Sequence, residues 1–180
     1  MPGANRARWG WHCLDKKWAS DIVQASKVDS RDLVLDVGAG SGALTVPLAA
    51  TGARVIAIEL HAQRYAELRS AMADASNVKV VRGDARDLWL PRRPFKVVAN
   101  PPFSVTSDLL WRLLHPGSRM TCAHLVLQLQ VARRLVSERG FRNSHVSLDV
   151  SINQRLPRSA FSPRPKVDVA VVHIHRRGVS

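Results

Sequence analysis

Short apolar runs alternate with segments of helical spacing through the first two thirds of the chain. The apolar runs cover 32–37, 54–59, 78–85 and 95–99. Apolar residues recur at helical spacing over 43–50, 62–75 and 104–114. Short apolar runs are typical of buried strands, whereas a spacing of three and four residues marks one face of a helix. Strands that alternate with helices predict a parallel, doubly wound α/β sheet with helices on both faces.

The pattern is less regular in the rest of the chain. We expect helices over 14–26 and 131–139, and strands over 124–129, 146–152 and 169–174. The segment 161–167 carries Pro163 and Pro165 and predicts an extended loop. A chain of 180 residues can bury one sheet-and-helix core. We therefore expect residues 1–180 to form a single domain, in which 1–26 are a basic and aromatic N-terminal arm and a first helix.

The strand over 95–99 ends at an unusual sequence, Asn100-Pro101-Pro102-Phe103. Proline cannot donate to a sheet ladder, so the strand must stop there. A residue before proline is extended, which places Asn100 at the carboxyl end of the strand. In open α/β sheets ligands bind at that end. The sequence therefore predicts a functional site at Asn100, although the plainer alternative is a loop that only terminates a strand.

These residues suit the methylation of a planar amino nitrogen, whose delocalised lone pair makes it a poor nucleophile. The Asn100 side-chain oxygen and the Pro101 carbonyl can accept its two hydrogens, which favours a more tetrahedral nitrogen and fixes the direction of attack. Phe103 can stack on the face of a target base. We take Asn100, Pro101 and Phe103 as the candidate catalytic residues.

The strand over 32–37 is followed by a glycine loop with Gly38, Gly40 and Gly42. Glycine lets a backbone turn sharply and approach a ligand closely, and the following helix N-terminus faces that ligand. The spacing Gly38-x-Gly40-x-x-Ala43 also fits the dinucleotide fingerprint, and a simple tight turn is a third alternative.

Two further strands end in acids. Glu59 lies 23 residues after Asp36, where a carboxylate can accept both ribose hydroxyls of NAD or S-adenosylmethionine. Asp84 is placed to accept the exocyclic amine of an adenine, and the Ala85 amide can donate to a ring nitrogen. Solvated carboxylates at strand ends are the alternative. The candidate cofactor-binding residues are Gly38, Ala39, Gly40, Gly42, Glu59, Leu60, Asp84, Ala85 and Asn100.

The chain is strongly basic, with a net charge of +13. Residues 112–180 hold 12 Lys and Arg against three acidic residues, a net of +9. Such a field attracts polyanions, although a solubilising surface or an acidic membrane could also explain it. Cations and aromatic residues alternate over 6–13 and can clamp nucleic acid or form an arm over the fold. The candidate RNA-binding residues are Trp9, Trp11, Arg133, Arg134, Arg164 and Lys166.

Several classes of protein and site are disfavoured. No run approaches the ~20 apolar residues of a membrane span, and residues 1–25 have no apolar signal-peptide core, so we expect a cytoplasmic protein. Cys13 and Cys122 are far apart and predict reduced thiols rather than a ligand cluster. His173 and His175 lie two apart without further ligands, so no metal is expected.

Together these motifs resemble the class I S-adenosylmethionine methyltransferases. The motifs are 36–42, Glu59, 83–85 and 100–103, and the Asn-Pro-Pro-Phe form points to amino-group methylation. Two later segments, 127–135 and 161–168, are similar to the rRNA adenine N6-methyltransferases of the KsgA and Erm types. The resemblance implies a Rossmann-like domain with a seven-stranded, mostly parallel sheet whose last strand is antiparallel. It also implies S-adenosylmethionine as cofactor and ribosomal RNA as partner, without a metal or a membrane.

The Erm type fits better than the KsgA type. It implies methylation of an adenine in large-subunit (23S) rRNA and resistance to macrolides, lincosamides and streptogramin B. Two features depart from the family. Residues 11–14 read Trp-His-Cys-Leu where the family usually has Gln-Asn-Phe-Leu, and the chain ends just after the last strand. The second feature resembles the short mycobacterial Erm type, for which we expect a monomer without a C-terminal helical domain.

Three other functions stay open. A protein methyltransferase acting on an amide or another side-chain nitrogen would also use the Asn100 motif, but it does not explain 161–168 or the charge. An RNA-binding or ribosome-assembly factor without activity would not need Glu59, Asp84 and Asn100. A NAD dehydrogenase explains the glycine loop and leaves 100–103 without a role.

Overall fold

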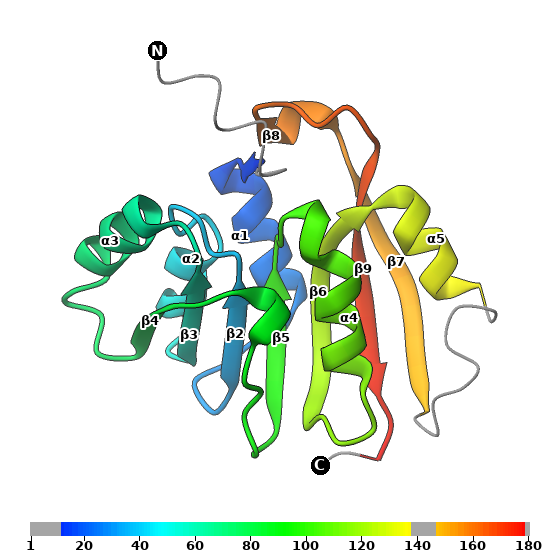
Figure 1. The fold of residues 1–180 in the computed structure, drawn as a ribbon, viewed down its shortest axis with the longest axis horizontal. Coiled ribbons are helices and arrows are strands. Elements are labelled where there is room, and N and C mark those ends of the chain that lie inside the picture. Colours follow the sequence, from blue (N-terminus) through cyan, green and yellow to red (C-terminus); the bar gives the residue numbers. More distant parts are fainter. Residues whose placement is uncertain (1–11, 138–146, 179–180) are drawn as a thin grey trace.

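A computed structural model describes residues 12–137 and 147–178. These residues form a seven-stranded sheet in the order β4-β3-β2-β5-β6-β9-β7 (Figure 1). The strands are β2 Leu33–Val37, β3 Arg54–Glu59, β4 Val78–Arg82, β5 Phe95–Ala99, β6 Met120–Gln128, β7 Leu148–Leu156 and β9 Val169–Arg176. β2 to β6 pair in parallel, and β9 lies antiparallel between β6 and β7. The predicted mostly parallel sheet with an antiparallel last strand is confirmed.

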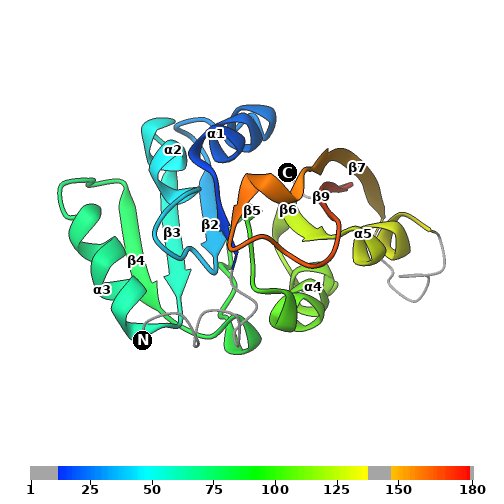
Figure 2. The same ribbon diagram turned by 90° about the horizontal axis from the view of Figure 1, so that it is seen from above.

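Helices cover both faces of the sheet, as expected (Figure 2). They are α1 Lys16–Ala25, α2 Thr45–Ala50, α3 Ala62–Ala71, α4 Thr106–Leu114 and α5 Leu129–Val136. Buried residues of α1 and α2 pack with Val55 and Val98 on one face, and Leu68 of α3 packs against Ala57 on the same side. Apolar residues of α4 and α5 pack with Val97 on the other face. No helix in the described part of the chain is long and apolar enough to cross a membrane.

Local sequence explains where several elements begin and end. Asp15 caps α1, because its side chain accepts a hydrogen bond from the Lys17 amide at 2.9 Å. The central strands β2 and β5 are buried on both faces, which is why they read as continuous apolar runs. Pro47 falls in the first turn of α2, where it costs no hydrogen bond.

Other boundaries differ from the prediction. α4 begins at Thr106 rather than at 104 as expected, because a 3-10 turn occupies Phe103–Val105. α3 ends at Ala71, before a turn in which the Ala75 amide bonds the Met72 carbonyl. β6 and β7 are nine residues each and longer than expected. β7 is largely exposed at the sheet edge, so its polar residues hide its extent.

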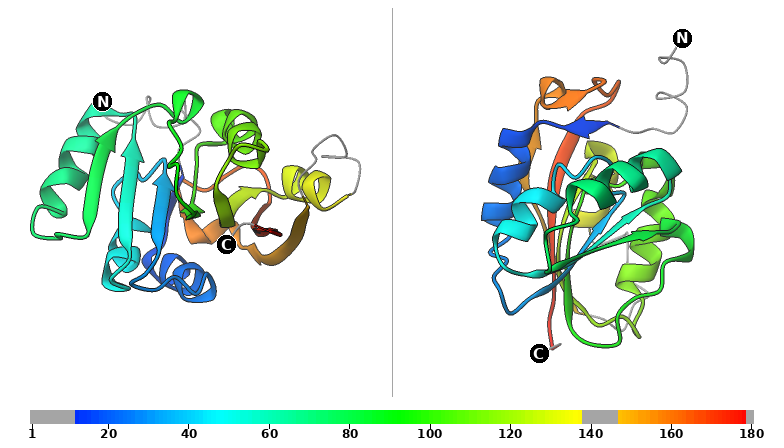
Figure 3. Two further views of the ribbon diagram at one scale, coloured as in Figure 1. Left: turned by 90° about the horizontal axis from the view of Figure 1, so that it is seen from below. Right: turned by 90° about the vertical axis from the view of Figure 1, so that its left-hand side faces the viewer.

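A second, two-stranded sheet was not predicted. β1 Cys13–Leu14 pairs antiparallel with β8 Phe161–Ser162, and the Asp15 amide donates to the Ala160 carbonyl at 2.8 Å. The two strands lie side by side above the carboxyl end of the main sheet (Figure 3, right). This pairing brings the N-terminal segment to the loop after β7, which the sequence predicted only as extended.

Candidate cofactor and acceptor site

The glycine loop after β2 presses against the loop after β5. Gly38, Gly40 and Gly42 all have positive φ, of 77°, 57° and 91°. A Cβ on Gly38 would lie 2.7 Å from the Pro102 Cδ, closer than real Cβ contacts come. Gly38 is therefore required both by its backbone angle and by its neighbour. The glycine loop and the Asn-Pro-Pro-Phe motif, which are distant in the sequence, are therefore in direct contact.

Asn100 follows β5 at the carboxyl edge of the sheet, as the prolines predict. Its Nδ2 donates to the backbone carbonyl of His12 at 2.8 Å. This bond fixes which end of the amide is which, because only nitrogen can donate to a carbonyl. Among the described residues no donor reaches the Asn100 Oδ1 or the Pro101 carbonyl. The two acceptors that the sequence predicts are thus held in place with free lone pairs.

His12 is a site residue that the sequence analysis missed. Besides its carbonyl bond to Asn100, its Nδ1 lies 2.7 Å from the Pro163 carbonyl, and its ring lies 5.4 Å from the Phe103 ring. Phe103 itself is half-buried and packs against the core beneath α1. The segment that departs from the family motif therefore contacts both Asn100 and Phe103. The carbonyl contact has no signature in sequence, since any residue type supplies a carbonyl.

Glu59 ends β3 and is 3% exposed. Its Oε2 accepts from the Gly40 amide at 2.8 Å, and its Oε1 accepts from the His61 amide at 2.7 Å and from Arg64 Nη2 at 3.1 Å. The carboxylate therefore ties the glycine loop to the start of α3. The sequence analysis assigned Glu59 to ribose binding alone and missed this structural role and the ion pair with Arg64.

Asp84 follows β4 and caps the 3-10 turn Ala85–Asp87. Its carboxylate bonds the Arg86 amide at 2.9 Å and the Arg86 guanidinium at 2.7 Å. The hydrogen bond and charge of Arg86 lower the pKa of Asp84, so this carboxylate is ionised at neutral pH. Ala85 is buried beside it.

A cleft of about 610 Å³ runs along the carboxyl ends of β2, β3 and β4. Its lining includes Gly38, Glu59, Leu60, Asp84, Ala85 and Pro102. A smaller hollow lies on the other side of Gly38 and is lined by His12, Gly40 and Asn100 among others. The larger volume is in the range of sites for small organic ligands. Gly38 borders both spaces, and Ala39 lies in the lining of the smaller hollow. The structure therefore brings the predicted cofactor residues and Asn100 to one edge, except Gly42, which lines neither space and packs against Leu68.

Asp36 lies beneath the glycine loop and is 1% exposed. Its Oδ2 accepts from the Thr45 hydroxyl at 2.6 Å. Burial, reinforced by the nearby charge of Glu59, raises the pKa of Asp36 to about 7. This environment of Asp36 was not predicted, although a carboxyl inside an apolar strand is a visible sign of it in the sequence.

The candidate RNA-binding residues are only partly brought together. Arg133 and Lys166 line one groove of about 400 Å³ where α5 follows β6, together with Arg158, whose guanidinium pairs with Asp168 at 2.8 Å. Arg134 and Arg164 are exposed and do not line it. Trp9 and Trp11 lie outside the described residues.

A family model, ribosomal RNA adenine dimethylase, matches residues 4–180. The chain belongs to this family. The resemblance to rRNA adenine N6-methyltransferases is therefore confirmed.

Curated relatives of this dimethylase-family chain include two named groups. An rRNA adenine N-6-methyltransferase of Bacteroides fragilis is 33% identical over 91% of this chain and 64% of its own length. A ribosomal RNA small subunit methyltransferase A of Levilactobacillus brevis is 33% identical over 87% of this chain and 58% of its own. The chain thus spans about three-fifths of the length of these relatives.

Solved structures agree with the fold of this family member. The crystal structure of the 23S rRNA methyltransferase ErmE has a TM-score of 0.83 at 26% identity, over 92% of this chain and 70% of that one. A dimethyladenosine transferase from Plasmodium falciparum has a TM-score of 0.79 at 29% identity, over 92% and 64%.

Proposed function

We propose that the chain transfers a methyl group from S-adenosylmethionine to N6 of an adenine in ribosomal RNA. The observation that carries this proposal is the geometry of Asn100. Its Nδ2 donates to the His12 carbonyl at 2.8 Å, so its Oδ1 is left to accept a hydrogen from an amine. The family membership supports the same reaction class.

The residues around the cleft fit an adenosyl cofactor. The close approach of Gly38 to Pro102 leaves a cradle that a Cβ would fill, and the cleft volume suits a ligand of that size. The backbone of 38–42 would lie under the methionine part, Glu59 would hold the ribose, and Asp84 with the Ala85 amide would hold the adenine. S-adenosylmethionine supplies an electrophilic methyl group on a positively charged sulfur.

Glu59 must share its carboxylate to bind the ribose, because its Oε1 already accepts two hydrogen bonds and its Oε2 one. A carboxylate has about four lone-pair sites, so one acceptor position is left without any rearrangement. A second ribose hydroxyl would replace the Arg64 contact, which at 3.1 Å is the longest of the three.

On the acceptor side, the chain has to hold and orient the target amine. Asn100 Oδ1 and the Pro101 carbonyl accept its two hydrogens, while Phe103 stacks the base, which must first leave its own stack. Asn100 Oδ1 and the Pro101 carbonyl would hold the nitrogen while it takes the methyl group, and its extra proton would then pass to solvent. No covalent intermediate with the protein is needed.

The basic groove beside the site supports a polyanionic substrate. Arg133 and Lys166 face the same hollow, and no acid among the described residues pairs with either. The groove begins at Gln128, where β6 ends, on the same carboxyl edge as Asn100. We propose that the phosphates next to the target adenine lie there, with Arg134, Arg164, Trp9 and Trp11 extending the surface.

We further propose large-subunit (23S) rRNA as the substrate, with resistance to macrolides, lincosamides and streptogramin B as the consequence. The support is the likeness to the 23S rRNA methyltransferase ErmE, at a TM-score of 0.83. Relatives named for the small subunit are equally similar in sequence, so the substrate needs a direct test. We propose that residues 1–180 carry out this reaction as a single domain.

The test is to incubate the protein with tritiated S-adenosylmethionine and, separately, 23S rRNA, 16S rRNA and ribosomal proteins. Label in N6-methyladenine of 23S rRNA is the expected result. Label in 16S rRNA would overturn the choice of subunit, and label in protein would favour the protein methyltransferase. RNA binding without label in any substrate would favour the non-catalytic assembly factor. The Asn100→Ala variant serves as the control for contaminating activity.

A further inference from the structure

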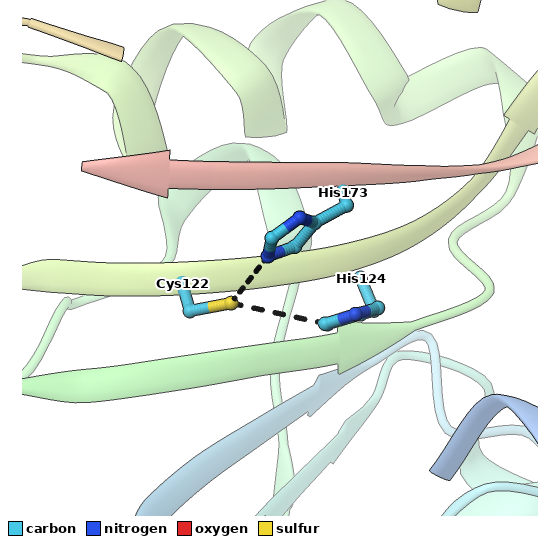
Figure 4. Close-up of side chains that lie close together, drawn as sticks. All are labelled: Cys122, His124 and His173. Atoms are coloured by element: carbon cyan, nitrogen blue, oxygen red, sulfur yellow. Dashed lines mark hydrogen bonds between the residues drawn. The ribbon is translucent and has the colours of Figure 1, made fainter. Parts of the chain in front are cut away.

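Three potential metal ligands meet on the sheet, away from the cleft. Cys122 and His124 are two residues apart on β6, so their side chains point to the same face. His173 is paired directly opposite His124 on the neighbouring β9. Figure 4 shows the three side chains converging from these two strands. The sequence analysis expected no metal, because this cluster forms only once β6 and β9 are in register.

The distances suit a small ion. The Cys122 Sγ lies 3.2 Å from His173 Nε2 and 3.9 Å from His124 Nδ1, and the three ligand atoms all lie within 4.8 Å of one another. Tetrahedral zinc, with bonds of about 2.3 Å to sulfur and 2.0–2.1 Å to nitrogen, separates these two ligand atoms by roughly 3.6 Å. The two observed distances bracket that separation.

The two imidazole rings would have to turn to share an ion. The His124 and His173 rings are stacked, with centroids 4.6 Å apart and planes 29° apart. Lone pairs of an imidazole lie in the ring plane, so a shared ion requires the two rings to turn toward each other. His173 is only half-buried, whereas His124 is 4% exposed, so His173 is the ring less confined by its neighbours.

A plain hydrogen bond explains only part of this cluster. A thiol and one imidazole, Cys122 and His173, already satisfy each other at 3.2 Å. For the His124 ring, the long 3.9 Å contact to the same sulfur is the one hydrogen bond found among the described residues. A polar ring that is so deeply buried normally has a strong partner. An ion shared by all three groups would provide it.

The surrounding charge does not prevent binding. Lys96 is the nearby cation on the adjacent strand β5, where it pairs with Cys122 in the strand register. Its Nζ donates to the Asp32 carboxylate at 2.7 Å and to the Lys27 carbonyl at 3.2 Å. Its charge is therefore offset by Asp32 and its hydrogens are directed toward those groups.

We propose that Cys122, His124 and His173 form a binding site for a zinc-class divalent cation, with water in the fourth position. One thiolate and two imidazoles are a ligand set that zinc prefers. On binding, the Cys122 thiol loses its proton to solvent, one metal–sulfur and two metal–nitrogen bonds form, and nothing is oxidised or reduced. The ion would tie β9 to β6 and would raise thermal stability without entering the methyl-transfer chemistry.

The test uses metal alone, on the full chain, without RNA or cofactor. After chelator treatment and dialysis, the protein is titrated with Co²⁺, whose bonds to thiolate give a charge-transfer absorption. We expect a single Co²⁺ per chain, displacement by Zn²⁺, release of one proton and a rise in Tm with Zn²⁺ concentration. Because methylation is not measured, the result is independent of the proposed function.

Matched variants locate the ligands. Cys122→Ser should abolish the charge-transfer band, whereas Cys13→Ser, which removes the other cysteine, should keep it. His173→Asn should weaken Co²⁺ binding by about tenfold or more, as the loss of a metal-binding partner typically does, whereas His175→Asn, two residues along the same strand, should leave it unchanged. His173 is half-buried, so its variant tests the site even if Cys122→Ser does not fold. A missing band in the wild-type protein, or a band that disappears in Cys13→Ser alone, would overturn the site.

Discussion

Asn100 and Glu59 both stand at the carboxyl ends of central strands, but the protein uses their polar atoms differently. The Asn100 Nδ2 donates to the His12 carbonyl, and among the described residues no donor reaches its Oδ1. Both carboxylate oxygens of Glu59 accept hydrogen bonds, from the Gly40 amide, the His61 amide and the Arg64 guanidinium. Asn100 is therefore ready to accept an amine hydrogen, whereas Glu59 has one acceptor position left, and binding of a second ribose hydroxyl would replace its Arg64 contact. A preorganised polar group such as the Asn100 oxygen favours the chemical step, whereas the hydrogen bonds that Glu59 already makes favour the stability of the fold.

The largest expected effect comes from removing the prepared acceptor. Asn100→Ala should cut methyl transfer by about 10²-fold or more, because a preorganised polar group of this kind contributes roughly 3 kcal/mol. Cofactor affinity should change little, since Asn100 faces the amine. Single-turnover labelling and calorimetry measure the two effects separately. Asn153→Ala, on exposed β7, is the matched control, and near-normal turnover in Asn100→Ala would remove its assigned role.

Glu59→Ala should give the opposite result. Loss of charge-assisted bonds to the ribose, worth about 1.5–3 kcal/mol each, should raise the cofactor Kd at least tenfold while RNA affinity barely moves. Because Glu59 also holds Gly40 and Arg64, the variant should lose thermal stability as well. Glu67→Ala, an exposed acid on α3, controls for charge. Unchanged cofactor affinity in the folded variant would reject the ribose role and leave the structural one.

Asp36 is buried beneath the glycine loop, and its raised pKa makes the free energy of unfolding depend on pH. Its pKa is raised to about 7 in the fold from 3.8, so between these values the folded chain keeps a proton that the unfolded chain has released. The free energy of unfolding should therefore fall by up to about 1.4 kcal/mol per pH unit over that window. Asp36→Asn keeps an oxygen for Thr45 and should remove this slope. Equal pH profiles for the two proteins in urea denaturation would contradict the raised pKa.

The smallest effect concerns the groove beside the acceptor side. Arg133 lines it and its neighbour Arg134 does not, so the two offer a charge-matched pair. Each phosphate contact contributes a slope of about −0.7 to log K against log salt on single strands. Arg133→Ala should flatten the slope by about 0.7, and Arg134→Ala by less; the double variant reaches about 1.4 only if both contact phosphate. Filter binding across a salt series decides, and equal slopes in all variants would exclude the groove.

The sequence predicts the parts of the fold that have a clear pattern of apolar and polar residues. The strands β2, β3 and β5 and the strand-end residues Asn100 and Glu59 were placed correctly, because buried parallel strands are apolar and their carboxyl ends share one edge. β4 was expected over 78–85 but ends at Arg82, because Asp84 caps a 3-10 turn that follows the strand. The ends of β6 and β7 were missed, since these strands have polar, exposed positions.

The missed parts of the site depend on contacts that residue types do not encode. β1 and β8 are two residues long, and their pairing joins distant parts of the chain. The role of His12 rests on its backbone carbonyl. The Cys122 cluster needs the register of β6 against β9. In each case the local pattern carries no signal, because the partner lies elsewhere in the sequence.

The pairing of β1 with β8 also has a consequence for the order of events during translation. The carbonyl that orients Asn100 belongs to a segment that is held by Phe161 and Ser162, and β9 fills an interior position of the sheet although it follows all the other strands. A nascent chain that has emerged only as far as β7 has therefore made every residue of the proposed catalytic set without being able to align them. Domains fold as units when such long-range contacts close. Competence for the proposed methyl transfer should consequently appear in one late step, after β8 and β9 have joined the fold.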